Sequence, residues 1–412
     1  MRSRILAGLA AIAVSATLAA CGSSDSGSSG NGGGSATAGA GNSDPIKIGV
    51  VADVTGPASS SFKTTEKGVE AYFKRINAAG GVNGHQIDYI MGDTTSTPAG
   101  ALTATQKLWQ NDHVIAIMQA SSVFDGVVPY TAQQHIPVIA GTTAGSVWSN
   151  SKYSNTFVAA GVLNSSNYPK AQGQYMKAQG VKNCAVLGVS DASSKTAAES
   201  WAASCKAAGL QVTYINTQLT YATTDLGPVA IAIKNAQADG VLSALATSQS
   251  FKLVANLREQ GVSPKSILLT TGYGSDLLQS SASIQAAQGV DFYTAGEPAE
   301  ANTAATKQRA DDLAAVGVTG PPSYGQQNGY LMASAATAGL KAAGANPTSG
   351  SLMNALAGIK DFDADGLLAP LKVNFRNYAP SQTCIWAARL SGQEFHVIEG
   401  TPVCAPTAKL DS

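Results

Sequence analysis

The chain has 412 residues, of which 44% are hydrophobic and 13% are charged, and its formal net charge is zero. A neutral chain without a basic cluster argues against a nucleic-acid partner. Beyond residue 20 no apolar run is long enough to span a bilayer, and the length of the remaining chain favours two domains over one.

The N-terminal segment has the three parts of an export signal. Arg2 and Arg4 form a positive region, an apolar run of 16 residues follows over residues 5–20, and Cys21 ends the run. The run is shorter than the roughly 20 residues that a membrane-spanning helix needs. Its end, Leu18-Ala-Ala-Cys21, resembles a bacterial lipobox. We therefore expect a signal peptide over residues 1–20 and a mature protein anchored by lipid on Cys21, at the outer face of the cytoplasmic membrane.

A tether follows the expected lipid anchor. Residues 21–44 consist mostly of Gly, Ser, Ala, Asn and Thr and contain no aromatic or large aliphatic side chain, so they cannot bury enough apolar surface to order themselves. As a flexible coil such a segment spans roughly 25–30 Å.

The rest of the chain alternates apolar runs with amphipathic segments. Residues 64–79 predict a helix because their apolar side chains recur at helical spacing, and Thr97-Pro98 has the composition of a helix start. Further helices are expected at residues 167–179, 195–208, 225–238, 250–260 and 275–281, and two or three between 303 and 360. Strands are expected at residues 46–52, 87–91, 114–118, 137–140, 156–160, 185–189, 212–215, 241–246, 267–270, 291–295, 371–375, 385–390 and 395–398.

This alternation predicts an α/β fold built from βαβ units with parallel sheets. About ten such units exceed one ordinary doubly wound sheet. Two Rossmann-like lobes, each open at the carboxyl ends of its strands, are the more economical arrangement, and a ligand would bind between them.

Four cysteines remain after Cys21, and they allow three disulfide connectivities. We expect the local pairs, Cys184–Cys205 and Cys384–Cys404, each stabilising the fold by about 3 kcal/mol. The alternative is four free buried thiols, which is less common outside the cytoplasm. No Cys/His spacing typical of a metal site occurs in the sequence.

Enzyme signatures are absent from the sequence. It contains no Gly-x-Ser-x-Gly elbow, no phosphate-binding GxxxxGK[ST] loop and no HExxH motif. We therefore expect neither catalysis nor a cofactor.

Several motifs follow one another in the order found in a known family. They are Thr55-Gly-Pro57, Gly68-Val-Glu-Ala71, the run Arg75-Ile-Asn-Ala-Ala-Gly-Gly-Val-Asn-Gly84, Asp93, Ser121-Ser122, Ile136-Pro-Val-Ile139 and Gly141-Thr-Thr143. This series resembles the leucine/isoleucine/valine-binding proteins, the type I periplasmic binding proteins of ABC importers. The resemblance implies two lobes joined by a three-strand hinge. Lobe I would comprise residues 45–162 and 292–360, lobe II residues 163–291, and residues 361–412 the hinge and the lobe II tail.

The resemblance also implies a ligand site. Ser121 falls where a family serine hydrogen-bonds the ligand carboxylate, with Ser122 beside it. Thr142 and Thr143 lie in the loop that holds the ligand's head group, although these residues could simply cap helices. Phe62 and Tyr324 lie where side chains flank the ligand, or could be packing residues.

The second lobe departs from the family pattern. Relatives that bind amino acids have an acidic residue after the ninth strand, and here Tyr273 takes its place. Because an unpaired buried ammonium costs several kcal/mol, we expect Tyr273 to cover a carboxylate, amide or aromatic acid instead, unless it is a packing residue. The carboxylates that could replace the missing acid are Asp191, Asp276 and Glu297. The family's cleft tyrosine after the sixth strand is replaced by one of Ser193, Ser194 and Lys195.

The expected function is that of a monomeric, lipid-anchored solute-binding protein that delivers a small polar solute to the permease of an ABC importer. A ligand sensor of the same fold that acts on a membrane receptor is the alternative. An extracytoplasmic enzyme on the same scaffold is the third hypothesis.

Overall fold

The computed structural model describes residues 43–163, 167–376 and 382–409. The expected signal peptide, Cys21 and nearly all of the expected tether lie outside the described residues. Within the described part of the chain, no helix combines the length and apolarity needed to cross a membrane.

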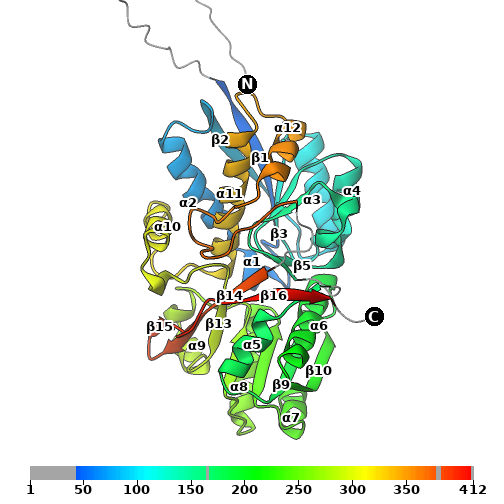
Figure 1. Cartoon of the computed structure of the whole chain (residues 1–412), viewed down its shortest axis with the longest axis vertical. Coiled ribbons are helices and arrows are strands. Elements are labelled where there is room, and N and C mark those ends of the chain that lie inside the picture. Colours follow the sequence, from blue (N-terminus) through cyan, green and yellow to red (C-terminus); the bar gives the residue numbers. More distant parts are fainter. Residues whose placement is uncertain (1–42, 164–166, 377–381, 410–412) are drawn as a thin grey trace, which may run out of the picture. The chain divides into compact units, whose positions relative to one another are not determined.

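The first sheet has five parallel strands in the order β2-β1-β3-β4-β6. They are β1 (Ser43–Ala52), β2 (His85–Asp93), β3 (Ile117–Ala120), β4 (Val138–Ala140) and β6 (Thr156–Val158). Because neighbouring side chains of a strand point to opposite faces, Val50 packs in one core and Val51 in another. This sheet and the helices on it are called lobe I (Figure 1).

Helices cover both faces of the lobe I sheet. α3 (Pro98–Gln110) and α4 (Val128–Gln133) contribute to the core on one side, and α2 (Thr65–Ala78) to the core on the other. α3 begins as its sequence predicts, since the Thr97 side chain accepts a hydrogen bond from the Gly100 N–H at 3.0 Å. The short α1 (Ser59–Phe62) follows the loop after β1.

The second sheet also begins with parallel strands, in the order β10-β9-β11-β12-β13, and continues with antiparallel strands β14-β16-β8. The parallel strands are β9 (Asn183–Val189), β10 (Gln211–Leu219), β11 (Gly240–Ala244), β12 (Ser266–Leu269) and β13 (Asp291–Thr294). The others are β8 (Asn167–Pro169), β14 (Gln382–Ser391), β15 (Glu394–Val397) and β16 (Val403–Lys409). β14 and β15, which overlap the strands predicted at 385–390 and 395–398, form a hairpin.

Five helices pack around the second sheet, and together they form lobe II. They are α5 (Ala171–Ala178), α6 (Ala192–Ala207), α7 (Gly227–Asn235), α8 (Thr247–Glu259) and α9 (Ser281–Ala286). α5 and α6 share a core with one face of the sheet, and α7 and α8 share a core with the other. The α/β fold class is therefore confirmed.

After β13 the chain returns to lobe I with α10 (Ala304–Ala314), α11 (Tyr324–Ala342) and α12 (Ser349–Gly358). α11 crosses α2 so closely that a Cβ on Gly68 would lie 2.0 Å from the Gln326 carbonyl oxygen, and one on Gly329 would lie 2.2 Å from the Thr65 carbonyl oxygen. Glycine at both positions is what permits this helix contact.

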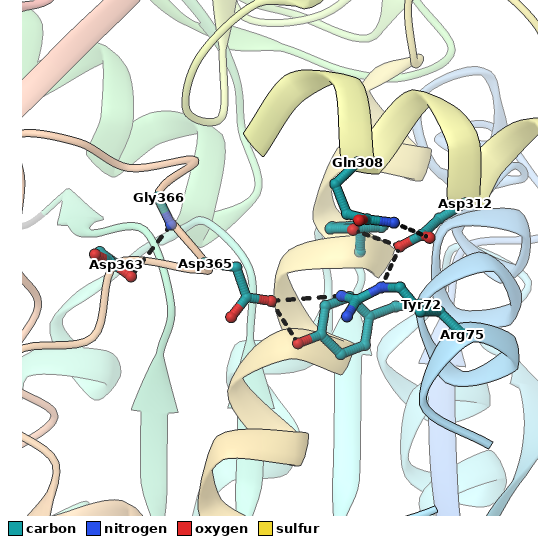
Figure 2. Close-up of polar contacts among 8 residues, drawn as sticks. Tyr72, Arg75, Gln308, Asp312, Asp363, Asp365 and Gly366 are labelled. Carbon is teal, nitrogen blue, oxygen red and sulfur yellow. Dashed lines mark hydrogen bonds and ion pairs between the residues drawn. The ribbon is translucent and has the colours of Figure 1, made fainter. Parts of the chain in front are cut away.

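An ionic network joins the returning segments to α2. Figure 2 shows Arg75 between Asp312 of α10 and Asp365, with its Nε 2.7 Å from the Asp312 carboxylate. Asp312 also accepts from the Tyr330 hydroxyl at 2.7 Å, and the Tyr72 hydroxyl donates to Asp365 at 2.7 Å. The side chain of Asp312 is only 5% exposed, so these donors compensate the burial of its charge.

The predicted strand at residues 371–375 does not form. Only an isolated bridge pairs Phe362 with Val373, while the rings of Phe362 and Phe375 pack 5.1 Å apart in the lobe I core. The apolar spacing of this segment serves packing against helices and strands rather than strand pairing. Residues 362–375, part of the segment expected to form the hinge and the lobe II tail, thus contribute to the lobe I core.

One of the two predicted disulfides is formed. Cys384 and Cys404 face each other directly on β14 and β16, and their sulfurs are bonded. Cys184 and Cys205 were expected to be bonded as well, but they are free thiols in the structure. Their sulfur atoms lie 2.7 Å apart, longer than the roughly 2.05 Å of a disulfide bond. The prediction that Cys184 and Cys205 are neighbours is therefore confirmed, but the predicted disulfide bond between them is absent from the structure.

Candidate functional site

A cavity is lined by loops that follow strands of both sheets. It encloses about 1170 Å³ of space free of protein atoms, part of which is open solvent. Its lining includes residues 119–122 at the end of β3, 142–144 after β4, 191, 193 and 194 after β9, 244–246 at the end of β11 and 270–271 after β12. The carboxyl ends of parallel strands gather loop and helix-start residues at one edge of each sheet, which is where α/β proteins bind ligands.

Six of the seven predicted ligand-contact residues line this cavity. They are Phe62, Ser121, Ser122, Thr142, Thr143 and Tyr324. The structure thus brings together residues that lie as far apart as α1 and α11. That they contact a ligand stays a prediction.

The two serines of lobe I are held by a buried aspartate. Ser121 Oγ donates to Asp53 Oδ1 at 2.6 Å, and Ser122 Oγ donates to Oδ2 at 3.0 Å. Ser121 Oγ also accepts from the Val123 N–H at 3.2 Å. A hydroxyl has one hydrogen to donate, so in this arrangement neither serine can donate to a ligand carboxylate, the role that was expected of Ser121.

Thr142 and Tyr324 form a second polar group on the lobe I side. The Thr142 hydroxyl lies 2.9 Å from both the Tyr324 hydroxyl and Asn328 Oδ1, and its N–H donates to the same Asn328 oxygen at 2.8 Å. The ring of Tyr324 meets the ring of Phe62 edge to face, with centroids 5.6 Å apart. These contacts fix the orientation of both aromatic rings at the cavity wall.

The lobe II wall carries Asp191 at the start of α6. Asp191 Oδ1 accepts from the Ser194 N–H at 3.0 Å, as an N-cap does, and Oδ2 accepts from the Tyr221 hydroxyl at 3.2 Å. Burial, together with nearby Asp53, raises the pKa of Asp191 to about 6. Burial also raises the pKa of Tyr221 well above its usual value, so this phenol stays protonated and remains a donor.

The prediction for Tyr273 is not supported by its position. Its side chain is 1% exposed and lies outside the cavity lining, with its ring 4.7 Å from that of Phe395. The hydroxyl donates to Glu300 at 2.7 Å and accepts from the Ala299 N–H at 2.9 Å. After β12, Thr271 lines the cavity and Tyr273 packs in the lobe II core. The position of Tyr273 in the sequence had suggested that its side chain faces the ligand, and the structure places it in the core instead.

Other lobe II residues that line the cavity include Tyr221 and Tyr293, which the sequence reasoning missed. Both lie in or just after a strand of the sheet, and that position is the signal that could have indicated them. Ser193, Ser194 and Asp191 were considered as alternatives and do line the cavity, whereas Lys195, Asp276 and Glu297 do not.

Two hydroxyl groups join α1 and α8 near the cavity. Ser61 Oγ lies 3.3 Å from Thr247 Oγ1 and 3.3 Å from the Thr247 backbone nitrogen. Ser61 itself lines the cavity. These hydrogen bonds link lobe I to lobe II beside the cavity. Water can replace each of these partners, so breaking the bonds costs little free energy.

The residues that the structure describes contain no group of three or more His, Cys, Asp or Glu side chains arranged to hold a metal ion. The cavity side chains instead offer hydroxyls, amides, aromatic rings and one carboxylate. Such a set suits the noncovalent recognition of a small organic molecule.

Comparisons with known proteins agree with this architecture. The sequence profile of the periplasmic binding protein family matches residues 45–394. A Leu/Ile/Val-binding protein homolog of Brucella abortus is 36% identical over 62 residues, which is 15% of this chain. The matched segment spans only 17% of the length of that relative.

Solved structures resemble the chain over most of its length. A fatty acid ABC transporter substrate-binding protein from Thermomonospora curvata is 21% identical with a TM-score of 0.73, covering 88% of this chain and 92% of that one. A branched-chain amino acid transporter substrate-binding protein from Streptococcus pneumoniae, solved with isoleucine, is 20% identical with a TM-score of 0.71, covering 86% and 99%. A solute-binding protein from R. palustris, solved with benzoate, is 18% identical with a TM-score of 0.71, covering 89% and 98%. At these identities the likeness shows the fold.

The family is extracytoplasmic and consists of solute-binding proteins rather than enzymes, so this protein is not an enzyme. The profile match covers well over half of the chain, and the two sheets with a shared cavity reproduce the fold of the solved relatives. The chain therefore belongs to the periplasmic binding protein family, in the type I class that includes the leucine/isoleucine/valine-binding proteins.

Proposed function

We propose that this protein captures one small solute in the cavity between its lobes and delivers it to the permease of an ABC importer. The supporting observation is the cavity itself, because loops from both sheets line it. A ligand that contacts both lobes binds most tightly to the conformation in which the lobes meet, and so shifts the population toward that conformation. A permease that recognises this conformation would receive loaded protein only.

The contacts to the solute would come from both walls. Phe62 and Tyr324 would supply an aromatic surface, and the hydroxyl-bearing residues Ser121, Ser122, Thr142 and Thr143 would supply polar contacts. From lobe II, Asp191, Tyr221 and Tyr293 would complete the site. Tyr273 has no place in it, because its hydroxyl is already bonded in the core.

We further propose that the protein acts as a monomer held to the outer face of the cytoplasmic membrane by lipid on Cys21. The arginines, apolar run and small residues before Cys21 support this part of the proposal. A single lipid-bearing terminus followed by a Gly- and Ser-rich segment would leave the folded body free to move above the membrane.

The experiment that tests the capture role is native mass spectrometry of mature protein purified from its own membranes without denaturation. A bound small molecule should be released on unfolding, and adding it back to ligand-free protein at about 100 times its Kd should stabilise the fold by about 2.7 kcal/mol. Tyr324→Phe should weaken this binding, whereas the matched control Tyr273→Phe should leave it unchanged.

Equal effects of the two tyrosine variants would place the ligand elsewhere. The delivery role is tested separately by uptake of the labelled solute. Uptake should disappear when the gene is deleted and return with the wild-type gene. Unchanged uptake after deletion would favour the sensor role instead.

A further inference from the structure

The cavity has an unbalanced charge. Asp191 is the one charged side chain among the described residues that line it, and that lining contains no lysine, arginine or histidine. Asp53 lies directly behind Ser121 and Ser122. Asp125 accepts from Trp148 Nε1 at 2.6 Å; burial, and then the charge of Asp191, raise its pKa to about 7, so Asp125 is only partly ionised at neutral pH. No ion pair found in the described chain involves any of these three carboxylates.

The hydroxyl groups around two of these carboxylates already donate their hydrogens to them. Ser121 and Ser122 donate to Asp53, and Tyr221 donates to Asp191. What this part of the wall offers a ligand is therefore oxygen lone pairs and negative charge. A carboxylate placed here would meet like charge, whereas a group with a positive charge and N–H donors would meet complementary partners.

The cavity continues from Asp191 along one face of α6. Ser194, Ala197 and Trp201 line it at spacings of three and four residues, which is one helix face. At a rise of about 1.5 Å per residue, Trp201 lies roughly 15 Å along the helix axis from Asp191. The lining of the cavity thus extends along nearly three turns of α6.

The far part of the cavity wall carries polar atoms without partners. Gln172 Oε1, Trp201 Nε1 and Thr383 Oγ1 have no hydrogen bond among the described residues, and their side chains are only 5%, 3% and 7% exposed. All three residues line the same cavity. Because a buried donor without an acceptor is costly, a ligand acceptor that reached the indole N–H of Trp201 would remove the cost of leaving it unpaired.

We propose that the natural ligand is an elongated amine, whose protonated nitrogen binds Asp191 and whose far end presents a hydrogen-bond acceptor to Trp201. This inference rests on the proposed capture role and specifies its ligand class. The acid that pairs with the nitrogen then follows β9, rather than β12, where amino-acid-binding relatives were expected to carry it and this chain has Tyr273. Ala197, between Asp191 and Trp201 on α6, faces the apolar middle of such a ligand.

Isothermal titration calorimetry with four matched probes tests the proposal: 6-aminohexanamide, hexylamine, hexanamide and hexanoate. The amino amide should bind at least about tenfold more tightly than hexanamide and hexanoate, since a charged hydrogen bond is gained. Asp191→Asn should weaken binding of the amino amide by about tenfold or more and leave hexanamide nearly unchanged. Trp201→Phe should weaken the amino amide but not hexylamine.

Glu300→Gln is the matched control, because Glu300 accepts from a tyrosine hydroxyl as Asp191 does but lies outside the cavity. It should change none of the affinities. Stronger binding of hexanoate than of the amines, no effect of Asp191→Asn, or failure of every amine to bind would each overturn the proposal. Leucine binding as tightly as the amino amide would overturn its elongated shape. A neutral or acidic molecule found by native mass spectrometry would overturn this inference and leave the capture role standing.

Discussion

Replacing Asp191 by asparagine should stabilise the ligand-free protein at neutral pH. Burial raises the pKa of Asp191 from the ordinary 3.8 to about 6, which means that the folded protein resists ionising this side chain. At about 1.4 kcal/mol per pH unit of pKa difference, ionised Asp191 costs the folded state up to about 3 kcal/mol, less whatever solvent screens. Asparagine is an equally good N-cap, so the start of α6 is preserved.

The sign of the pH dependence follows from the raised pKa. Below about pH 3.8 the aspartate is protonated in both the folded and the unfolded chain. Its ionisation then makes no difference between the free energies of unfolding of the wild type and the variant. As the pH rises through about 6, the wild type progressively loses the stability that protonated Asp191 provides. The advantage of Asp191→Asn should therefore grow from pH 4 to pH 6 and then remain constant.

Calorimetric unfolding of ligand-free wild type and variant at pH 4, 5, 6 and 7.5 measures this difference. The probe ligand 6-aminohexanamide should reverse the order of stability at pH 7.5, because only the wild type binds it tightly. A variant less stable than the wild type at pH 7.5, or a difference that is constant from pH 4 to pH 7.5, would refute the reasoning about the burial of Asp191.

Four further predictions concern the rest of the chain. Asp312→Ala should lower the free energy of unfolding by about 3 kcal/mol, measured by urea denaturation, because it removes the nearer of the two carboxylates that pair with the partly buried Arg75 and the acceptor of the Tyr330 hydroxyl. Gly329→Ala should destabilise lobe I by at least about 1–3 kcal/mol in the same assay, because the added Cβ would collide with a backbone oxygen of α2. Cys184 and Cys205 should resist alkylation in the native protein and react after unfolding without reductant; no reaction then would mean that they are bonded. Cys21→Ala should release the protein from the membrane fraction without changing its unfolding temperature.

The sequence predicted the fold well because its two periodicities are strong. The predicted strands 114–118 and 241–246 read as continuous apolar runs and overlap the buried parallel strands β3 and β11, and the helices between strands repeat at helical spacing. In the C-terminal part of the chain the same signal gave a false strand at 371–375 and missed β16. β16 pairs with β14 and with the distant β8, and such non-local pairing leaves no local pattern to read.

The sequence predicted six residues that line one cavity, but it did not predict how their polar groups are hydrogen-bonded. Ser121 and Thr142 were found because they follow strands, and strand ends meet at one edge of a sheet. The direction of the Ser121 hydroxyl depends on Asp53, which lies 68 residues earlier in the chain. No local pattern connects these two residues, so the sequence suggested a donor to the ligand where the structure has an acceptor.

The charge of the site is set by the same long-range contacts. The fold persists in relatives at 15–21% identity, and it fixes only where the loops gather, not which side chains they carry. In this chain the β12 loop sends Tyr273 into the core, while the β9 loop places Asp191 on the cavity wall. Asp191 also caps α6, so one carboxylate both starts the helix and gives the cavity its negative charge. These two roles of Asp191 can be separated by mutation. Asparagine can also cap the helix, but it cannot provide the negative charge that would bind a protonated amine.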